Sequence, residues 1–582
     1  RAGLAIVEAL SGLNERLQTG RIPRIQVRIG IHTGIVVIGD MGGTYRRAEQ
    51  LALGETPNLA ARIQGLAEPN TVLISEATHR LVTGYFECRA REAESVKGFA
   101  RPLALFQVLH ETTARSRLEV VGKSSWTPLV GREQEMSFVL GRWERAKEGL
   151  GEVVVVSGEG GIGKSRLVQA LVQHAADEGQ AWLTPLQCSP YHRGTALYPM
   201  IDFLQRVVLQ FEKDDSARKQ WSRLEGLALQ YGLPPAETAA LFALLLAVPI
   251  PDEHPPLHLT PERQKQKTLQ LLETILIEHS SRQPLLFLVE DLQWVDPTTL
   301  ELLTHLVDQV PTRRILALYT CRPDFEVPWQ GRSHVTQLNL SRLSRREIGE
   351  MVLRLTHGQA LPAEVLEPIL TKTDGVPLFV EELTKMVLES GFLVAEAGRY
   401  RLDGPLPSLA IPATLQDSLM ARLDRLSSVK DVAQLAAVLG REFTFELLLA
   451  VAELDPSVLR QEIEQLIEAE LLYRRGTPPS STYIFKHALI QEAAYQSLLK
   501  SKRQHYHQRV AEVLRQRFPE IAATQPEVLA HHCTEAGMWV EAIAQWRRAG
   551  EQAIRRSAHL EAIAHHSRGL KLLTSLPDNP ER

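Results

Sequence analysis

Paired cysteines and long apolar runs are both missing from this chain of 582 residues. No Cys-x-x-Cys pair occurs, which argues against a structural zinc site and fits a reducing compartment. The longest apolar stretch, residues 239–250, is shorter than the about 20 residues that a membrane-spanning helix needs, so we interpret it as a buried helix and expect no membrane partner. The cysteines lie far apart, at Cys88, Cys188, Cys321 and Cys533. We therefore expect a cytoplasmic protein.

A strong charge of either sign is also absent, because 65 lysines and arginines nearly balance 69 acids and the formal net charge is -4. Such a chain has no global attraction to phosphate backbones, so nucleic acid is not an expected partner. With 44% hydrophobic and 23% charged residues, the composition is that of a globular protein. The length is too great for one core and indicates about three to five domains.

The first block, residues 1–110, has the pattern of an α/β layer domain. An amphipathic helix is followed by alternating apolar and polar residues over 25–43, which predict a hairpin around Thr33 and Gly34. A further helix and strand complete the block. Residues 111–127 are polar and lack periodicity, so we expect a linker there.

The rest of the chain predicts a multidomain protein of α/β and α class. Apolar strands alternate with helices over 128–345, the pattern of a parallel sheet covered on both faces. Helices dominate 346–410. Residues 411–510 show helices, a strand, a turn, a second strand and a helix, the order of a winged helix. Residues 511–582 form helical pairs in which Glu-Ala-Ile-Ala recurs after 20 residues, unlike the period of about 34 in tetratricopeptide arrays.

The strongest motif is a glycine-rich phosphate loop, GEGGIGKS, between a predicted strand and a predicted helix. Its glycines let successive backbone N–H groups converge on a phosphate, Lys164 can reach the outer phosphates, and Ser165 can ligate Mg²⁺ at a helix N-terminus. ATP or ADP with Mg²⁺ is therefore the expected ligand. The glycines of the motif are Gly158, Gly160, Gly161 and Gly163.

Two acids, Glu290 and Asp291, end a later buried strand. One is expected to hold Mg²⁺ and the other to polarise water, and the sequence leaves open which does which. Asp296 precedes a proline, which indicates a helix cap. Arg322 follows another strand and would point at the γ-phosphate from the C-terminal edge of the sheet, with a surface salt bridge as the alternative.

These motifs resemble the STAND branch of AAA-type ATPases, signalling switches whose nucleotide-binding core is followed by a helical segment and a winged helix. LVGRE, SGEGGIGKS, LVEDLQWVDP, TCRP and TDGVPLF all fit that family. The resemblance covers residues 128–510 and implies a P-loop ATPase over 128–345 with slow, regulatory hydrolysis. The helical pairs of 511–582 are tetratricopeptide-like in general kind and offer a surface for a protein partner.

Two finer features follow from the same resemblance. The turn Gly375-Val376-Pro377 would pack near the nucleotide, and a plain helix-breaking turn is the alternative. His487, in the run FKHALIQEAAY, stands where these proteins often carry a histidine that senses the diphosphate, and a satisfied histidine of the core is the alternative.

The first block carries a second resemblance. VRIGIHTGIVVIGDMG followed by LGETPNLAARIQ is similar to the C-terminal half of a class III adenylate or guanylate cyclase domain. In that family an asparagine orients the ribose and an arginine stabilises the α-phosphate as the 3'-hydroxyl displaces pyrophosphate, and Asn58 and Arg62 match these positions. Four residues apart on one helix, they share a face, and a preorganised arginine suits developing phosphoryl charge. An ordinary amphipathic helix with a solvated Arg62 is the alternative.

The sequence departs from the cyclase pattern in two ways. The two metal-binding aspartates of the family lie in the first half of the domain, and only one helix precedes the expected hairpin here, so we expect this fragment alone to be inactive as a cyclase. Glu49 stands where adenylate cyclases usually carry a base-selecting aspartate, so ATP and GTP both stay open, as does a plain surface charge. Cyclases of this family build their sites between two domains, which implies a dimer partner.

Together the two resemblances predict a cyclic nucleotide signalling protein that converts ATP to cyclic AMP and pyrophosphate, with Mg²⁺ or Mn²⁺, under the control of its ATPase. The alternative is an ATP-switched transcription regulator or scaffold with a degenerate cyclase domain. The expected recognition stretch of the winged helix, 455–472, has five acids and one arginine and would repel phosphates. The basic run at 500–509 keeps DNA binding open.

Overall fold

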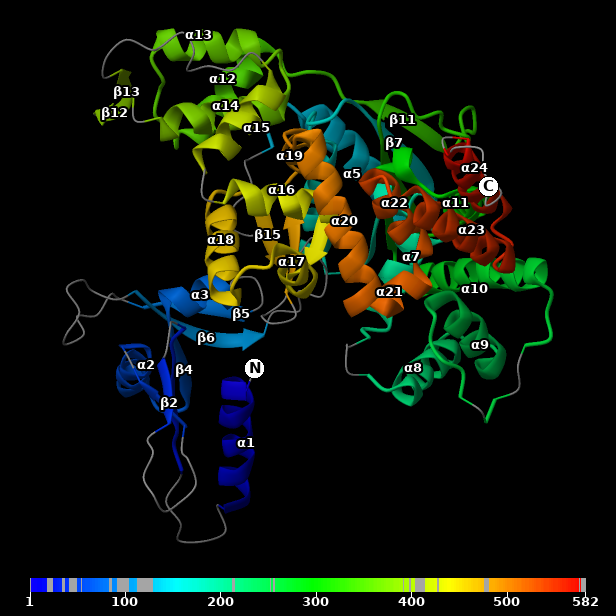
Figure 1. The fold of residues 1–582 in the computed structure, drawn as a ribbon. Coiled ribbons are helices and arrows are strands. Elements are labelled where there is room, and N and C mark those ends of the chain that lie inside the picture. The colour runs from blue at the N-terminus through cyan, green and yellow to red at the C-terminus, as the bar shows by residue number, and fades with distance from the viewer. Residues whose placement is uncertain are drawn as a thin grey trace. The chain divides into compact units, whose positions relative to one another are not determined.

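The computed structural model divides into two compact units, Arg1–Trp126 and Thr127–Arg582. Figure 1 shows the course of the chain from blue at the N-terminus to red at the C-terminus. The residues that the structure describes are 2–17, 25–33, 37–40, 50–53, 55–82, 86–91, 104–111, 129–179, 181–211, 215–251, 253–254, 257–390, 392–396, 399–402, 414–426, 429–475, 481–574 and 576.

The first unit is an α/β layer. Its elements are α1 (Ala2–Leu17), β1 (Arg28–Ile31), β2 (Val37–Asp40), β3 (Gln50–Leu53), α2 (Glu55–Leu66), β4 (Thr71–Ser75), α3 (Glu76–Val82), β5 (Phe86–Ala90) and β6 (Leu105–Glu111). The main sheet has the order β1-β4-β6-β5. Side chains of β4 alternate between the two faces of this sheet. Leu73 packs with Leu59 and Ile63 of α2 on one face. Val72 and Ile74 pack with side chains of α1 on the other face.

The hairpin predicted around Thr33 and Gly34 is not seen among the described residues, and Gly34 itself lies outside them. In the described part of this unit, β1 pairs with β4 in parallel, and β2 pairs with β3. Alternation of apolar and polar residues identifies a strand but not its neighbour. Helix α2 approaches β1 so closely at Gly30 that an added Cβ would lie 2.1 Å from the backbone nitrogen of Gln64, so this contact requires glycine.

A five-stranded parallel sheet, in the order β11-β7-β10-β9-β8, lies at the centre of the second unit. Its strands are β7 (Glu152–Ser157), β8 (Trp182–Gln187), β9 (Leu285–Glu290), β10 (Ile315–Cys321) and β11 (Val335–Asn339), and the helices around it are α5 (Glu133–Lys147), α6 (Lys164–Asp177), α10 (Pro261–Arg282) and α11 (Pro297–Gln309). Strands β7 and β10 are buried throughout, as expected for parallel strands with both faces covered. The predicted parallel sheet is confirmed.

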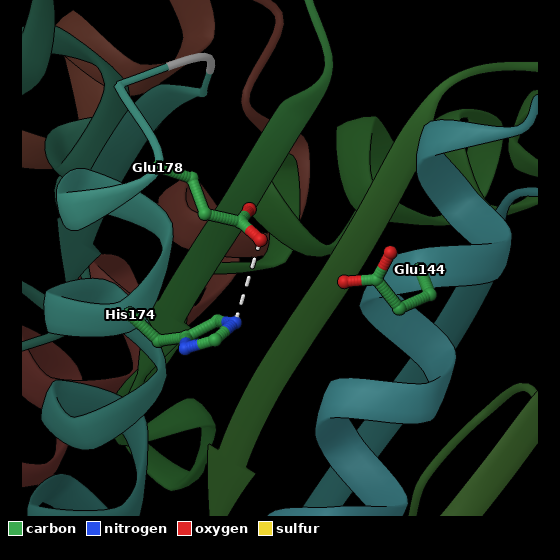
Figure 2. Close-up of side chains that lie close together, drawn as sticks. All are labelled: Glu144, His174 and Glu178. Atoms are coloured by element: carbon green, nitrogen blue, oxygen red, sulfur yellow. Dashed lines mark ion pairs between the residues drawn. The ribbon is translucent and has the colours of Figure 1, made fainter.

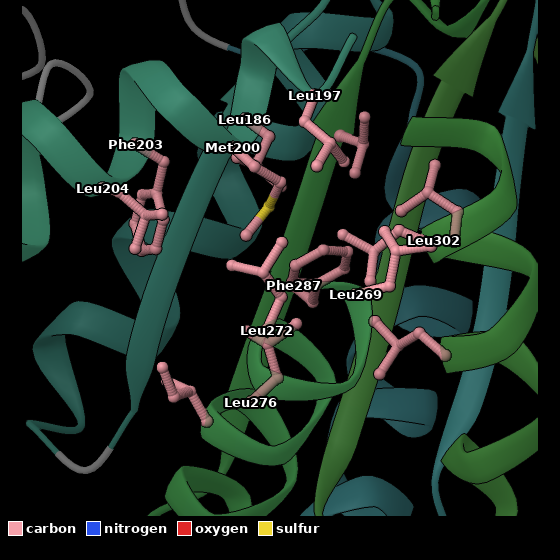
Figure 3. Close-up of a cluster of buried hydrophobic side chains, with 14 of the residues drawn as sticks. Leu186, Leu197, Met200, Phe203, Leu204, Leu269, Leu272, Leu276, Phe287 and Leu302 are labelled. Atoms are coloured by element: carbon pink, nitrogen blue, oxygen red, sulfur yellow. The ribbon is translucent and has the colours of Figure 1, made fainter. Parts of the chain in front are cut away.

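One face of this sheet forms a large apolar core (Figure 3). Phe287 of β9 packs there with Leu269 and Leu272 of α10 and with Met200 from the segment between β8 and β9. Between β8 and β9 the chain forms α7 (Tyr198–Phe203), α8 (Ala217–Gln230) and α9 (Pro235–Leu246). Helix α9 holds most of the apolar stretch noted in the sequence, and its Phe242 is buried, which confirms a buried helix. Across the described ranges, no helix is both long enough and apolar enough to span a membrane.

Helices and two small sheets make up the rest of the second unit. Up to residue 475 the elements are α12 (Arg345–Leu355), α13 (Ala363–Lys372), α14 (Pro377–Glu389), β12 (Leu393–Glu396), β13 (Arg399–Leu402), α15 (Leu415–Arg425), α16 (Lys430–Leu439), β14 (Glu442–Thr444), α17 (Phe445–Ala452), α18 (Pro456–Glu468) and β15 (Leu472–Arg475). They are followed by β16 (Thr482–Phe485), α19 (Ala488–Gln496), α20 (Lys500–Arg517), α21 (Pro519–Thr524), α22 (Pro526–Ala536), α23 (Trp539–Arg555) and α24 (His559–Leu573).

The small antiparallel sheet has the order β14-β16-β15 and lies among α16 to α19. Helices, two strands and a helix thus follow one another here as the sequence predicts, with β14 as an additional strand. Helix α20 runs through residue 510, so the domain boundary that we predicted there lies inside a continuous helix.

Candidate functional site

The phosphate loop joins the buried strand β7 to the start of α6. Its backbone takes the left-handed conformation at Gly161 (φ 81°) and Gly163 (φ 103°), which favours glycine. A Cβ at Gly161 would also lie 3.1 Å from the Cβ of Leu378 on α14. Glycine is therefore needed at position 161 both for the turn of the loop and for the close approach of α14.

Lys164, the first residue of α6, is buried at the loop. Its ammonium donates hydrogen bonds to the carbonyl oxygens of Gly158 at 2.7 Å and Glu159 at 2.9 Å. Burial lowers the pKa of Lys164, and the opposing charge of Asp291 is the largest effect that raises it. The ammonium thus lies over the loop, within the field of the acid at the end of β9.

Ser165 and Glu290 meet directly. The Ser165 hydroxyl donates to Oε2 of Glu290 at 2.6 Å, although the two residues are 125 positions apart. Glu290 ends β9, which brings its carboxylate to the same edge of the sheet as the phosphate loop. Two oxygen donors side by side are the kind of ligands that Mg²⁺ takes in nucleotide sites, so these residues fit that ion.

Asp291 faces a different set of groups. Its backbone is left-handed, with φ 64°, and its N–H donates to Oγ1 of Thr320 at 3.0 Å. One carboxylate oxygen accepts from Gln293 at 3.0 Å, and the other accepts from Gln187 at 3.3 Å. The second oxygen also lies 3.4 Å from a guanidinium nitrogen of Arg441.

Arg322 follows β10 at the same edge. Its backbone N–H donates to Oε1 of Gln293 at 3.1 Å, and its guanidinium lies 5.4 Å from the centre of the Trp294 ring. The positive charge of Arg322 also lowers the pKa of Lys164. The structure therefore brings Arg322, Lys164 and the two acids together, and a contact of Arg322 with a γ-phosphate stays a prediction.

The turn Gly375-Val376-Pro377 packs on the phosphate loop. The N–H of Leu378 donates to the carbonyl of Gly161 at 3.2 Å. This contact supports the expected position near a nucleotide. The turn also separates α13 from α14, which begins at Pro377, as the alternative of a helix-breaking turn requires, and a place near a bound nucleotide stays a prediction.

Two arginines, Arg342 and Arg132, contact residues of the phosphate loop. Arg342 pairs with Glu159 of the loop at 2.9 Å and also pairs with Asp374. Buried Arg132, from the LVGRE motif, donates to the carbonyl of Ile162 at 3.3 Å. Neither arginine is among the site residues that the sequence predicts, although Arg132 belongs to the LVGRE motif.

His487 is half-buried and stands directly before α19 as its N-cap residue. Burial lowers its pKa to about 3, so its imidazole is neutral at pH 7. A Cβ placed on Gly160 would lie 3.6 Å from Leu489 of the same helix, which shows that α19 adjoins the phosphate loop. A role for His487 in sensing a diphosphate stays a prediction.

In the first unit, Asn58 and Arg62 lie on α2 and are both exposed. Their neighbours Leu59 and Ile63 are buried, so α2 is amphipathic with the two predicted site residues on its outer face. This arrangement suits a substrate contact and equally an ordinary surface helix. Glu49 lies outside the described residues.

A separate polar cluster lies on α5 and α6. Figure 2 shows His174 of α6 and Glu178, the residue that follows α6, facing Glu144 of α5. The ammonium of Lys147 lies 2.9 Å from Glu144 and 3.1 Å from Glu178. Its hydrogen bond to Glu178 is the main cause of the lowered pKa of Glu178. The carboxylates are thus neutralised by a lysine, and we interpret the cluster as surface ion pairs of small energetic weight.

Two sequence families match the chain. The adenylate and guanylate cyclase catalytic domain matches residues 2–110, and the AAA ATPase domain matches residues 128–318. The chain joins a cyclase catalytic domain segment to an AAA ATPase domain.

Curated relatives match all or part of this chain. An uncharacterized protein of Rhizobium meliloti is 28% identical over 97% of this chain and 53% of its own length. Adenylate cyclase type 10 of Mus musculus is 21% identical over 73% of this chain and 29% of its own length. Adenylate cyclase 1 of Rhizobium meliloti is 30% identical over 19% of this chain and 16% of its own length. The chain thus spans about half or less of these relatives.

Solved structures are also similar to parts of the chain. The adenylyl cyclase CyaB of P. aeruginosa is 29% identical over 19% of this chain and 57% of that chain, with a TM-score of 0.18. A STAND protein with a tetratricopeptide repeat sensor from Pyrococcus horikoshii is 13% identical over 78% of this chain and 66% of that chain, with a TM-score of 0.39.

Proposed function

We propose that this chain belongs to an adenylate cyclase whose output is regulated by an ATP-binding ATPase domain. The observation that carries the proposal is the match of one chain to a cyclase catalytic domain and to an AAA ATPase domain. The relatives named adenylate cyclase support ATP as the cyclase substrate. GTP is the alternative, because the family description covers both nucleotides.

Asn58 and Arg62 act in the cyclase step. The 3'-hydroxyl oxygen bonds to the α-phosphorus, the bond from that phosphorus to the bridging oxygen breaks, pyrophosphate leaves, and the hydroxyl proton passes to water. Arg62 stabilises the charge that develops on the α-phosphoryl oxygens, and Asn58, one turn earlier, orients the ribose. A second cyclase domain supplies the carboxylates for Mg²⁺ or Mn²⁺, so the active form is a dimer of cyclase domains.

The ATPase site works as a slow switch. Lys164 and the loop N–H groups bind the outer phosphates, while Ser165 and Glu290 hold Mg²⁺, which neutralises phosphate charge when bound. The oxygen of a water molecule bonds to the γ-phosphorus, the bond to ADP breaks, and Asp291 takes the proton of the water. The hydrogen bond between Ser165 and Glu290 supports this division of roles.

Cyclic nucleotide formation by the full-length protein tests the cyclase proposal. We expect Arg62→Ala to lower cyclic AMP formation from ATP by about a hundredfold or more, the usual effect of removing a group that stabilises a transition state. Arg89→Ala, which removes an exposed arginine of β5, is the matched control and should change little. Equal activity of the two variants would contradict the proposal. So would the absence of product when the full-length protein is given ATP or GTP with Mg²⁺ or Mn²⁺.

A further inference from the structure

The turn before β14 reaches the edge of the ATPase sheet that holds the phosphate loop and the two acids. Arg441, the residue between Gly440 and β14, places a guanidinium nitrogen 3.4 Å from Oδ2 of Asp291, 150 residues earlier in the chain. The two side chains are only 24% and 18% exposed. Because both side chains are largely shielded from solvent, water and salt screen the attraction between their charges less than in a surface pair.

The turn is held in place by contacts on both sides of Arg441. Glu442 pairs with Arg206 of the ATPase domain at 2.6 Å. A Cβ at Gly440 would lie 3.4 Å from the ring of Tyr191, and the Tyr191 hydroxyl donates to the carbonyl of Ala437 at 3.4 Å. Arg441 is therefore carried by a packed surface between the small sheet and the ATPase, and its position depends on that packing.

The contact involves only one of the two neighbouring acids. Glu290 accepts from Ser165 at 2.6 Å and faces the phosphate loop. Asp291 accepts from Gln293 on one oxygen, and from Gln187 on the oxygen that also faces Arg441. Three of the about four acceptor positions of this carboxylate are therefore occupied, two of them on the oxygen that faces Arg441, which restricts how the carboxylate can turn toward a water molecule beside the γ-phosphate.

We propose that Arg441 is a positioning residue that restrains Asp291 and keeps ATP hydrolysis slow while the turn 440–442 is packed on the ATPase domain. Movement of that turn away from the sheet edge releases Asp291 to accept the proton of the attacking water. The state of the region around β14 thereby sets the lifetime of bound ATP. The inference rests on the ATPase part of the proposed function.

Steady-state ATP hydrolysis by the full chain tests this restraint. We expect Arg441→Ala to raise kcat about tenfold, the factor that one charge-assisted hydrogen bond controls, with little change in KM. Arg441→Lys keeps the charge but loses the planar fork, so its kcat should fall between the two. Glu442→Gln weakens the pair with Arg206 that holds the same turn, so it should raise kcat by less than Arg441→Ala does. Arg345→Ala, which removes an exposed arginine paired with Glu367, is the matched control and should leave kcat near the wild-type value.

A double variant separates restraint from general loosening. In the Asp291→Asn background, Arg441→Ala should give no increase, because the group that is released is missing. A lower kcat in Arg441→Ala, or in Arg441→Lys if the alanine variant does not fold, would show instead that Arg441 acts in the reaction. An unchanged kcat would overturn the inference. ATP binding by the wild-type chain is measured in parallel, because its absence would overturn the proposed ATPase function itself.

Discussion

At the scale of single residues, two adjacent acids at the end of β9 have different neighbours. Glu290 accepts from the Ser165 hydroxyl, whereas Asp291 is held by side-chain donors from β8 and from the turn after β9. The left-handed backbone of Asp291 (φ 64°), which costs about 1 kcal/mol in a residue other than glycine, allows this separation. It supports Glu290 as the Mg²⁺ ligand and Asp291 as the acceptor of the proton, a choice that the sequence leaves open.

Asp296 gives a prediction for pH dependence. The predicted cap is confirmed, because its carboxylate accepts from the N–H of Thr299 at 2.8 Å and also from the N–H of Leu197 at 2.9 Å. Burial, with a smaller contribution from Glu561, raises the pKa of Asp296 to about 7. The pKa in the folded protein lies above that in the unfolded chain, so the protonated form stabilises the fold at low pH. This contribution is lost as the pH rises through about 7.

We therefore expect Asp296→Asn, which keeps the capping oxygen, to flatten the fall in the free energy of unfolding between about pH 4 and pH 7, the range between the unfolded and folded pKa values. Urea denaturation at several pH values measures this slope. Asp308→Asn, an exposed acid of the same helix, is the control and should keep the wild-type slope. A wild-type slope in Asp296→Asn would contradict the assignment.

At the scale of elements, the packing of α2 on β1 positions the proposed cyclase residues. Gly30→Ala would push a Cβ into the backbone of α2, with contacts of 2.1 Å and 2.6 Å to Gln64 N and Ala60 O. Backbone cannot move away as a side chain can. We expect this variant to lower the melting temperature of the first unit and to abolish cyclic AMP formation.

Gly65→Ala is the matched control for that prediction. Gly65 lies in α2 itself, and a Cβ there has nothing within 4 Å, so alanine should stabilise the helix by about 0.5–1 kcal/mol. Thermal unfolding and cyclase assays of both variants provide the measurement. A Gly30→Ala variant with the stability and activity of the wild type would show that α2 does not rest on β1 at this position.

The same elements show what the sequence can predict. The parallel sheet and the phosphate loop could be predicted, because apolar strands and short glycine motifs are local patterns. The partner of β1 could not, since alternation in one strand carries no information about its neighbour. The contact between Arg441 and Asp291 joins residues 150 positions apart and depends on how the small sheet packs on the ATPase, which no short motif encodes.

At the scale of the whole molecule, the C-terminal helices contact the ATPase close to its acids. Glu561 of α24 accepts from the N–H and the hydroxyl of Thr298, at 3.0 Å and 2.7 Å, at the start of α11. His565 lies 3.0 Å from the carbonyl of Gly194. Figure 1 shows α22 to α24 beside α11. The helical pairs are thus packed against the segment that follows Glu290 and Asp291.

The central claim is that ATP bound at the phosphate loop regulates cyclic AMP formation. The most direct test is the rate of cyclic AMP formation by the full-length protein and its Lys164→Ala variant, at equal concentration and with ATP binding measured in both. The account predicts that the variant loses binding at the ATPase site and that its cyclase rate differs from the wild type by severalfold. Equal cyclase rates, despite lost binding, would contradict the account and leave two nucleotide sites that share a chain without regulating each other.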